Sequence, residues 1–568
     1  MDEKLSREGQ PSAATNPVTA LPACDDPIAD LQQAKAEAND ASKTVPSSHR
    51  AVWLVGAIAL ALSLSSFIYF YSHGMTNVYG DGVAHLNIAR KVVDSPDDSL
   101  WQRYMQIGSP WLPLQTALLL PLVANDWMWR TGVGGSVISM LSFCIAGIAL
   151  YLHARLFYEK EDERYRTVLP ALAAAIFLLN PTALYLQTTP MSEPLFIASL
   201  AVAAYLLQRW IVGQSGGRLV AAGCGMTVAT LARYEAWPIA ALSILVVFAA
   251  ARGSVRVRLS HALLFALLVA AGPAYWLWHN WAIYGDAFWF LTGPYSARGI
   301  YLQSQAALGW AKVFVGNAPL ALLLMSSMVV VCVGPLLIIP AAVGFVRTIK
   351  TRWGDTVSFA PALLLLVPFV FHTLSLYRGE IQVFPLSAFG LLNVRYGLPH
   401  LLAVALFAPA AVPLLDGPGR RWAVGVMCTV IATQYGWLIS EGPSQLAIYQ
   451  EGYRNGVNSR PARERARFSN SLREHPPDPV ILMHTGALGP VVSQSGLRFS
   501  DLIHEGTIRW HQIERGIPED VMTIILQEGD PLDQRLRANP TLSRELAETF
   551  KEQTSVGTIK AFGRVTKQ

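Results

Sequence analysis

Charged residues are scarce in this chain, and their scarcity excludes an ordinary soluble protein. Only 15% of the 568 residues are charged, whereas 52% are hydrophobic, and a typical globular domain carries about 25% charged residues. Apolar runs recur from residue 52 to about residue 440, each near the roughly 20 residues that a helix needs to cross a bilayer. The sequence therefore predicts a polytopic membrane protein with helical spans, because lipid satisfies no open backbone polar group.

Cysteines and nucleotide-binding motifs are also scarce. Four of the five cysteines lie inside apolar segments, and their spacing gives neither a disulfide framework nor a metal motif. The chain has no Walker motif and no GxGxxG between a strand and a helix, which argues against a reaction driven by ATP or a nucleotide sugar. Residues 1–50 lack the apolar core of a signal peptide, and their composition predicts a disordered cytoplasmic segment.

The basic residues report topology. They do not form a patch with interleaved aromatic residues, so they give no indication of nucleic-acid binding. They lie in short loops between apolar runs, which the positive-inside rule places in the cytoplasm. These loops are Arg155–Arg166, Arg209–Arg218, Arg252–Arg258, Arg347–Arg352 and Arg420–Arg421.

Consistent alternation of these loops fixes the predicted organisation. It requires a large first external loop, 73–131, in which Trp111–Ala124 is a short helix lying against the outer face. The domain over residues 51–441 then contains about eleven spans in total, and their odd number places the C-terminus outside. The run 317–345 holds three prolines and is expected to be kinked. We expect a bacterial inner-membrane protein.

Residues 442–568 differ from the rest because they are charged and contain only short apolar stretches. Val480–Met483, Val521–Leu526 and Val556–Phe562 are predicted strands, and Leu488–Ser495 and Asp533–Phe550 are predicted to be helical. The expected fold class is thus mainly α, a polytopic helical bundle with a small extracytoplasmic α/β domain at its C-terminus.

The predicted external loops collect groups suited to one chemistry. An acid can take a proton from an acceptor hydroxyl, arginine can hold a phosphate leaving group, and aromatic rings can stack on a sugar. A donor linked to lipid would need no nucleotide cradle. The candidate catalytic acids are Asp81 and Glu193, and the candidate substrate-binding residues are His85, Arg233, Tyr234, Glu235, Tyr295, Arg395 and Tyr396.

Six motifs extend this pattern over residues 50–440. They are Asp81 with Ala84-His85-Leu86, Gly108-Ser109-Pro110-Trp111-Leu112-Pro113-Leu114, Pro190-Met191-Ser192-Glu193-Pro194-Leu195, Ala232-Arg233-Tyr234-Glu235-Ala236-Trp237, Gly293-Pro294-Tyr295-Ser296-Ala297 and Asn393-Val394-Arg395-Tyr396-Gly397-Leu398-Pro399. In these motifs the chain resembles the GT-C superfamily of integral-membrane glycosyltransferases. The resemblance is to the bacterial relatives of protein O-mannosyltransferases and of the aminoarabinose transferase that modifies lipid A.

The resemblance implies a function and roles for residues. It implies that Asp81 is the general base, that the donor is a polyprenyl-phosphate-linked sugar, and that Arg395 and Arg233 bind the phosphate. The acceptor, whether protein, lipid or glycan, stays open. Asp81 is followed by Gly82, and Ser192-Glu193 stands in place of Asp-x-Asp, so a divalent metal is an open alternative and not an expectation.

Each candidate also has a structural interpretation. Asp81 could cap a helix that begins near Val83, Glu193 could serve the helix that begins before Pro194, and Glu235 could simply pair with Arg233. His85 could tune Asp81, bind a metal or make an ordinary polar contact.

Two interpretations concern the whole protein or its tail. A flippase or transporter for lipid-linked glycans is the alternative function, although no repeat is evident and the acids cluster at one interface. In the tail, His484-Thr485-Gly486 is expected to form a strand-to-helix turn and not a second catalytic centre.

Overall fold

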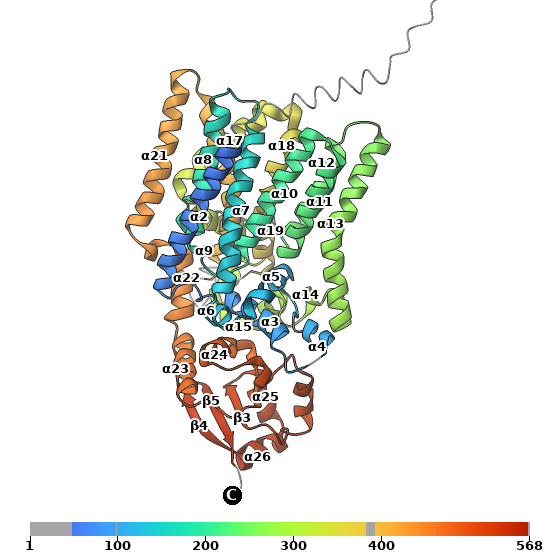
Figure 1. The fold of residues 1–568 in the computed structure, drawn as a ribbon, viewed down its shortest axis with the longest axis vertical. Coiled ribbons are helices and arrows are strands. Elements are labelled where there is room, and N and C mark those ends of the chain that lie inside the picture. Colours follow the sequence, from blue (N-terminus) through green and yellow to red (C-terminus); the bar gives the residue numbers. More distant parts are fainter. Residues whose placement is uncertain (1–47, 98, 382–391, 566–568) are drawn as a thin grey trace, which may run out of the picture. The chain divides into compact units, whose positions relative to one another are not determined.

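The computed structural model describes residues 48–97, 99–381 and 392–565, without the side chains of residues 48 and 304–311 (Figure 1). The predicted disordered segment 1–50 therefore lies almost entirely outside the described residues. The chain divides into two units, residues 1–51 and 52–568. The second unit contains nearly all of the described helices and every described strand.

The membrane-spanning part is built from long apolar helices. In the described ranges, six helical segments are long and apolar enough to cross a bilayer, or up to seven if one bent pair forms a single span. They confirm an integral membrane protein. The six are α2 (Ser48–Ser72), α7 (Val133–Phe157), α10 (Glu193–Gly213), α13 (Val255–Tyr284), the segment Val394–Leu414 formed by η3 (Val394–His400), α20 (Leu401–Phe407) and η4 (Ala408–Leu414), and α21 (Pro418–Ser440).

The bent pair lies in the proline-containing run 317–345, as expected. Helices α16 (Ala318–Val333) and α17 (Pro335–Arg352) meet at Gly334, and the segments Ala318–Val333 and Pro335–Leu364 are bent by 110° relative to each other. A break of this kind leaves backbone carbonyls without intrahelical partners. Nδ2 of Asn180 donates to the carbonyl of Cys332 at 3.1 Å, and Nε2 of Gln434 donates to that of Val333 at 3.1 Å. Side chains from two other segments thus stabilise the bend.

Shorter helices occupy several of the other predicted spans. Each of them is shorter than the roughly 20 residues that a single helix needs to cross a bilayer. The total of eleven spans therefore stays a prediction. The predicted span 357–376 is two helices with a break between them. The shorter helices are α8 (Tyr165–Leu178), α9 (Pro181–Leu186), α11 (Gly216–Ala232), α12 (Ala236–Ala250), α18 (Thr356–Leu364) and α19 (Val367–Arg378); η1 (Gly309–Phe314) and η2 (Trp353–Asp355) are 3₁₀ turns, and α14 (Trp289–Thr292) and α15 (Ala297–Leu308) follow α13.

The described residues between α2 and α7 form four short helices. The predicted helix Trp111–Ala124 is present but begins later, at Leu114, with Pro113 as its N-cap. Nη1 of Arg90 donates to the carbonyl of Val123 at 2.7 Å, which satisfies an open carbonyl at the end of that helix. The four helices are α3 (Gly80–Val93), α4 (Leu100–Met105), α5 (Leu114–Val123) and α6 (Asp126–Thr131).

Up to residue 565, where the described residues end, the C-terminal part contains one mixed sheet of five strands, in the order β2-β1-β3-β5-β4. The central strand β3 (Thr523–Gln527) pairs in parallel with β1 (Ile481–Met483) and antiparallel with β5 (Ile559–Arg564). These three strands confirm the three predicted ones. At the edges, β2 (Leu502–Ile503) pairs in parallel with β1 and β4 (Phe550–Val556) antiparallel with β5.

Four helices accompany this sheet: α23 (Arg460–Glu474), α24 (Thr485–Ser495), α25 (Pro531–Ala538) and α26 (Pro540–Thr549). The predicted helix Leu488–Ser495 lies within α24. The predicted helical segment Asp533–Phe550 is confirmed as two helices, α25 and α26, because Asn539-Pro540 lies between them and proline excludes an uninterrupted helix.

One hydrophobic core joins this C-terminal part to the segment after α2. Leu86 and Trp129 from the segment and Leu488 and Phe499 from the C-terminal part belong to the same buried cluster. Nδ2 of Asn87, in the middle of α3, donates to the carbonyl of Gly489 at 2.9 Å. Helix α24 of the C-terminal part therefore packs directly on α3, the helix that carries Asp81 (Figure 1).

A close approach between two segments allows a test of this packing. A Cβ on Gly135, in the first turn of α7, would lie 2.2 Å from Cβ of Pro190, just before the Ser192-Glu193 motif. Gly135→Ala should lower the free energy of unfolding by about 1–3 kcal/mol, because an overpacked core must shift backbone. Gly217→Ala is the matched control, since a Cβ there meets nothing within 4 Å. Thermal unfolding in detergent measures both, and equal midpoints would contradict the packing.

Candidate active site

Asp81 lies in the first turn of α3 and points to an arginine. The helix begins at Gly80, with Tyr79 as its N-cap residue in extended conformation, so the alternative in which Asp81 caps a helix beginning near Val83 is wrong. A carboxylate in the first turn is still favoured by the helix dipole. The Asp81 side chain is 48% exposed and pairs through Oδ2 with Nη2 of Arg395.

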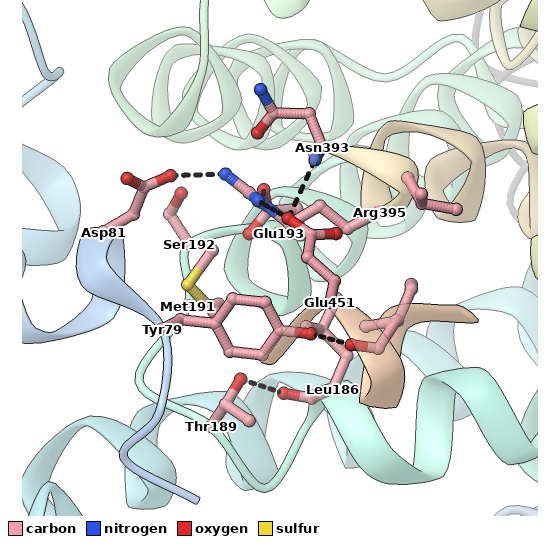
Figure 2. A network of polar contacts seen from close by, with 12 residues as sticks. Tyr79, Asp81, Leu186, Thr189, Met191, Ser192, Glu193, Asn393, Arg395 and Glu451 are labelled. Carbon is pink, nitrogen blue, oxygen red and sulfur yellow. Dashed lines mark hydrogen bonds and ion pairs between the residues drawn. The ribbon is translucent and has the colours of Figure 1, made fainter. Parts of the chain in front are cut away.

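Arg395 is the centre of the site, because three carboxylates contact its guanidinium group. Its Nε donates to Oε1 of Glu193 at 2.9 Å and its Nη1 to Oε1 of Glu451 at 2.6 Å, while Nη2 meets Asp81 (Figure 2). The side chains of Glu193 and Glu451 are 1% and 2% exposed. Two buried acids thus hold the guanidinium group through Nε and Nη1, and its Nη2 faces the half-exposed Asp81.

Arg233 is a second cation beside Glu193. Its Nη1 donates to Oε1 of Glu193 at 3.1 Å and its Nε to Oε1 of Glu235 at 2.9 Å. The Arg233–Glu235 pairing that the sequence suggested is therefore present, and Glu235 also accepts from Nε2 of His372 at 2.9 Å. One buried carboxylate, Glu193, therefore lies between two guanidinium groups, where loss of either partner would leave an uncompensated charge.

Tyr396 packs against both arginines. The guanidinium carbon of Arg233 lies 5.0 Å from its ring centroid and that of Arg395 lies 5.6 Å away. Contacts of this kind favour a cation over the ring face. Tyr396, expected to bind substrate, contacts the two arginines in this structure, and its place between them restricts where they can move.

His85 makes a ring contact instead of a charged one. It is 4% exposed, and its ring centroid lies 4.6 Å from that of Trp111. Burial lowers the pKa of His85 to about 4, so the ring is neutral near pH 7. Within the described ranges, no three His, Cys, Asp or Glu side chains are placed to hold a metal ion, and the carboxylates of the site are directed at guanidinium groups.

Two predicted substrate-binding residues lie elsewhere. The hydroxyl of Tyr234 accepts from Nε1 of Trp276 at 2.8 Å, and its ring stacks on Phe290 at 5.1 Å, in a separate aromatic cluster. Tyr295, between α14 and α15, has a side chain that is 55% exposed. Among the described contacts, neither tyrosine reaches Asp81, Glu193 or Arg395.

Sequence reasoning missed Glu451 and His372. Glu451 lies in α22 (Ala447–Gly452), at the start of the charged tail, where nothing in the sequence distinguishes it from the other charged residues. The available signal was position: like Asp81, Glu451 is an acid a few residues beyond a long apolar run. His372 lies within the apolar helix α19, and an ionisable residue inside such a segment marks a functional or paired site by default.

The fold is similar to that of solved structures of ArnT, over nearly the whole length of both chains. ArnT from Cupriavidus metallidurans bound to undecaprenyl phosphate matches over 90% of this chain and 98% of that chain, with a TM-score of 0.51 and 14% sequence identity. The apo state of the same transferase matches over 91% and 98%, with a TM-score of 0.50 and 13% identity.

The remaining comparisons are more distant or negative. An Archaeoglobus fulgidus oligosaccharyltransferase matches over 90% of this chain and 73% of that chain, with a TM-score of 0.46 and 12% identity. No protein-family model matches the sequence, and no curated protein matches it.

The buried His85 predicts a pH-dependent stability. The folded state binds this proton only near pH 4 and the unfolded state near pH 6.5, so stability is present above pH 6.5 and falls as the pH drops towards 4. The loss is up to about 3 kcal/mol at 1.36 kcal/mol per pKa unit. His85→Phe keeps a ring against Trp111 but cannot titrate, so it should lose less stability than wild type between pH 7 and pH 4.5.

Thermal unfolding at the two pH values measures this difference. His475→Phe is the control, because His475 is exposed at the end of α23. Parallel loss of stability in wild type and His85→Phe would show that His85 is not buried in its neutral form.

Proposed function

We propose that this protein is a glycosyltransferase that moves a sugar from a polyprenyl-phosphate donor to an acceptor on the outer face of the bacterial inner membrane. The observation that carries the proposal is the pair of a half-exposed Asp81 and a buried Arg395, held at the end of apolar helices. The GT-C fold supports it, since ArnT holds undecaprenyl phosphate on the same fold. In this proposal the first loop, 73–131, and the C-terminal domain lie on the outer side.

We propose complementary roles for the two residues. Nη2 of Arg395 meets the donor phosphate and stabilises the charge that develops on it, and the Asp81 carboxylate turns to the acceptor hydroxyl and takes its proton. A bond forms between the acceptor oxygen and the anomeric carbon while the bond from that carbon to the phosphate oxygen breaks. The electron pair leaves with the polyprenyl phosphate, and attack from the opposite side inverts the anomeric centre.

Glu193 has a supporting role in this mechanism. The sequence suggested a second catalytic acid, but a side chain that is 1% exposed and shared by two arginines is poorly placed to touch a substrate. We infer that Glu193 holds Arg395 and Arg233 side by side. The second cation then adds to the positive potential that attracts the phosphate.

Removal of the proposed base gives the decisive variant. Asp81→Asn keeps an oxygen that can accept from Nη2 of Arg395, so the fold should persist, whereas transfer should fall by about 10²–10⁴-fold with the loss of general-base catalysis. The assay is transfer from a labelled polyprenyl-phosphate sugar by purified protein. Asp416→Asn is the control, because the Asp416 side chain is 94% exposed beyond η4 and should keep full activity.

Undiminished transfer by Asp81→Asn would remove Asp81 from the mechanism. Movement of lipid-linked glycan across vesicle membranes without any transfer would instead support a flippase or transporter.

The donor itself can be identified from the purified protein. Buried cations beside a predicted lipid interface should retain an anionic lipid through purification, because charge-assisted bonds to phosphate are strong in a low dielectric. Mass spectrometry of lipids that co-purify should detect a polyprenyl phosphate or its sugar conjugate in wild type and less of it in Arg395→Gln. Recovery of phospholipids alone from both proteins would contradict the proposed donor class.

A further inference from the structure

The segment between α21 and α23 lies against the site on two sides. We name residues 443–458 the strap; it contains η5 (Pro443–Gln445), α22 (Ala447–Gly452) and a turn of π-helix over Tyr453–Val457. Nothing in the sequence singled it out. Yet it supplies one of the three carboxylates on Arg395, and it also contacts the residues that lead to Asp81 (Figure 2).

The first contact is with the chain just before Asp81. The hydroxyl of Tyr79 donates to the carbonyl of Ile448 in the strap. A Cβ on Gly452 would lie 2.8 Å from Cγ2 of Val78, and a Cβ on Gly456 would lie 1.8 Å from the carbonyl oxygen of Val78. The two glycines therefore let the strap approach Val78-Tyr79 more closely than a residue with a side chain could. Tyr79 lies only two residues before Asp81.

The second contact is with the chain around Arg395. Oε1 of Glu451 accepts both from Nη1 of Arg395 at 2.6 Å and from the backbone amide of Asn393 at 2.8 Å. Asn393 has φ of 57°, a left-handed conformation that residues other than glycine adopt rarely. One buried carboxylate thus holds a side chain and the backbone two residues before it, which together set the direction of the guanidinium group.

We propose that Glu451 is a positioning residue that aims Nη2 of Arg395 at the reaction site and limits how tightly Arg395 holds an anion. The strap connects both sides of the Asp81–Arg395 pair, so its removal should disturb both. The effect on geometry is independent of the reaction, whereas the effect on anion affinity rests on the proposed function.

The charge of Glu451 and its shape can be separated experimentally. Burial raises the pKa of Glu451 against the opposing effect of Arg395. Glu451→Gln keeps an oxygen for Arg395 and Asn393 but removes the negative charge. Glu451→Ala removes both the charge and the oxygen that accepts from Arg395 and from the amide of Asn393, which loosens the chain on both sides of the strap.

The test uses the full chain in detergent and two measurements. Hydrogen–deuterium exchange of peptides over 76–82 and 393–398 reports the geometry, and binding of undecaprenyl phosphate reports the affinity for an anion. Glu451→Ala should increase exchange in both peptides and weaken binding by more than about 10-fold, since Arg395 is no longer aimed. Glu451→Gln should keep exchange near the wild-type level and bind undecaprenyl phosphate about 3–10-fold more tightly, because removal of a like charge strengthens anion binding.

Each result decides something. Glu441→Gln is the control, because Glu441 is exposed at the end of α21 and should change neither measurement. Unchanged exchange in Glu451→Ala would overturn the positioning role, and weaker binding by Glu451→Gln would overturn the role of the charge. If wild-type protein binds no undecaprenyl phosphate while Glu451→Ala still loosens both peptides, the proposed donor is wrong and the positioning role stands.

Discussion

The structure of the site depends on the need to neutralise one buried guanidinium group. Arg395 is paired with carboxylates that lie 314, 202 and 56 residues away in the sequence, on α3, on α10 and in the strap. In a medium of low dielectric constant, removal of one partner from such a set costs several kcal/mol, because a charge is left without compensation. The three segments are therefore held in register by charge as well as by apolar packing.

The helices around this cluster are interrupted where two backbone segments approach each other closely. Arg395 lies on η3 and not on a regular α-helix, and a Cβ on Gly397 would lie 2.3 Å from the carbonyl oxygen of Met328 on α16. Irregular backbone inside a membrane protein is tolerated where it is buried in protein. Glu193 and Glu451 are buried whereas Asp81 is half exposed, so Asp81 is the most accessible of these three acids.

The sequence was enough to predict most of the helices and the central strands, whereas the edge strands and the ion pairs of the site could not be predicted, for physical reasons. Hydropathy predicted the helices, because burial in lipid requires long apolar runs, and three strands of the sheet followed from short ones. The two edge strands could not be predicted, because β2 has only two residues and β4 is largely polar and exposed. Asp81 and Arg395 could each be identified as a polar residue beside an apolar run. The ion pairs of Arg395 with Asp81 and with Glu451 join segments far apart in the sequence, so no local pattern predicts them.

The sharpest test of the Asp81–Arg395 mechanism is a structure of the full chain with bound undecaprenyl phosphate. We expect the phosphate against Nη2 of Arg395, with the Asp81 carboxylate displaced from the guanidinium while Glu193 and Glu451 keep their contacts. A phosphate bound elsewhere, with the Asp81–Arg395 pair intact, would contradict this mechanism.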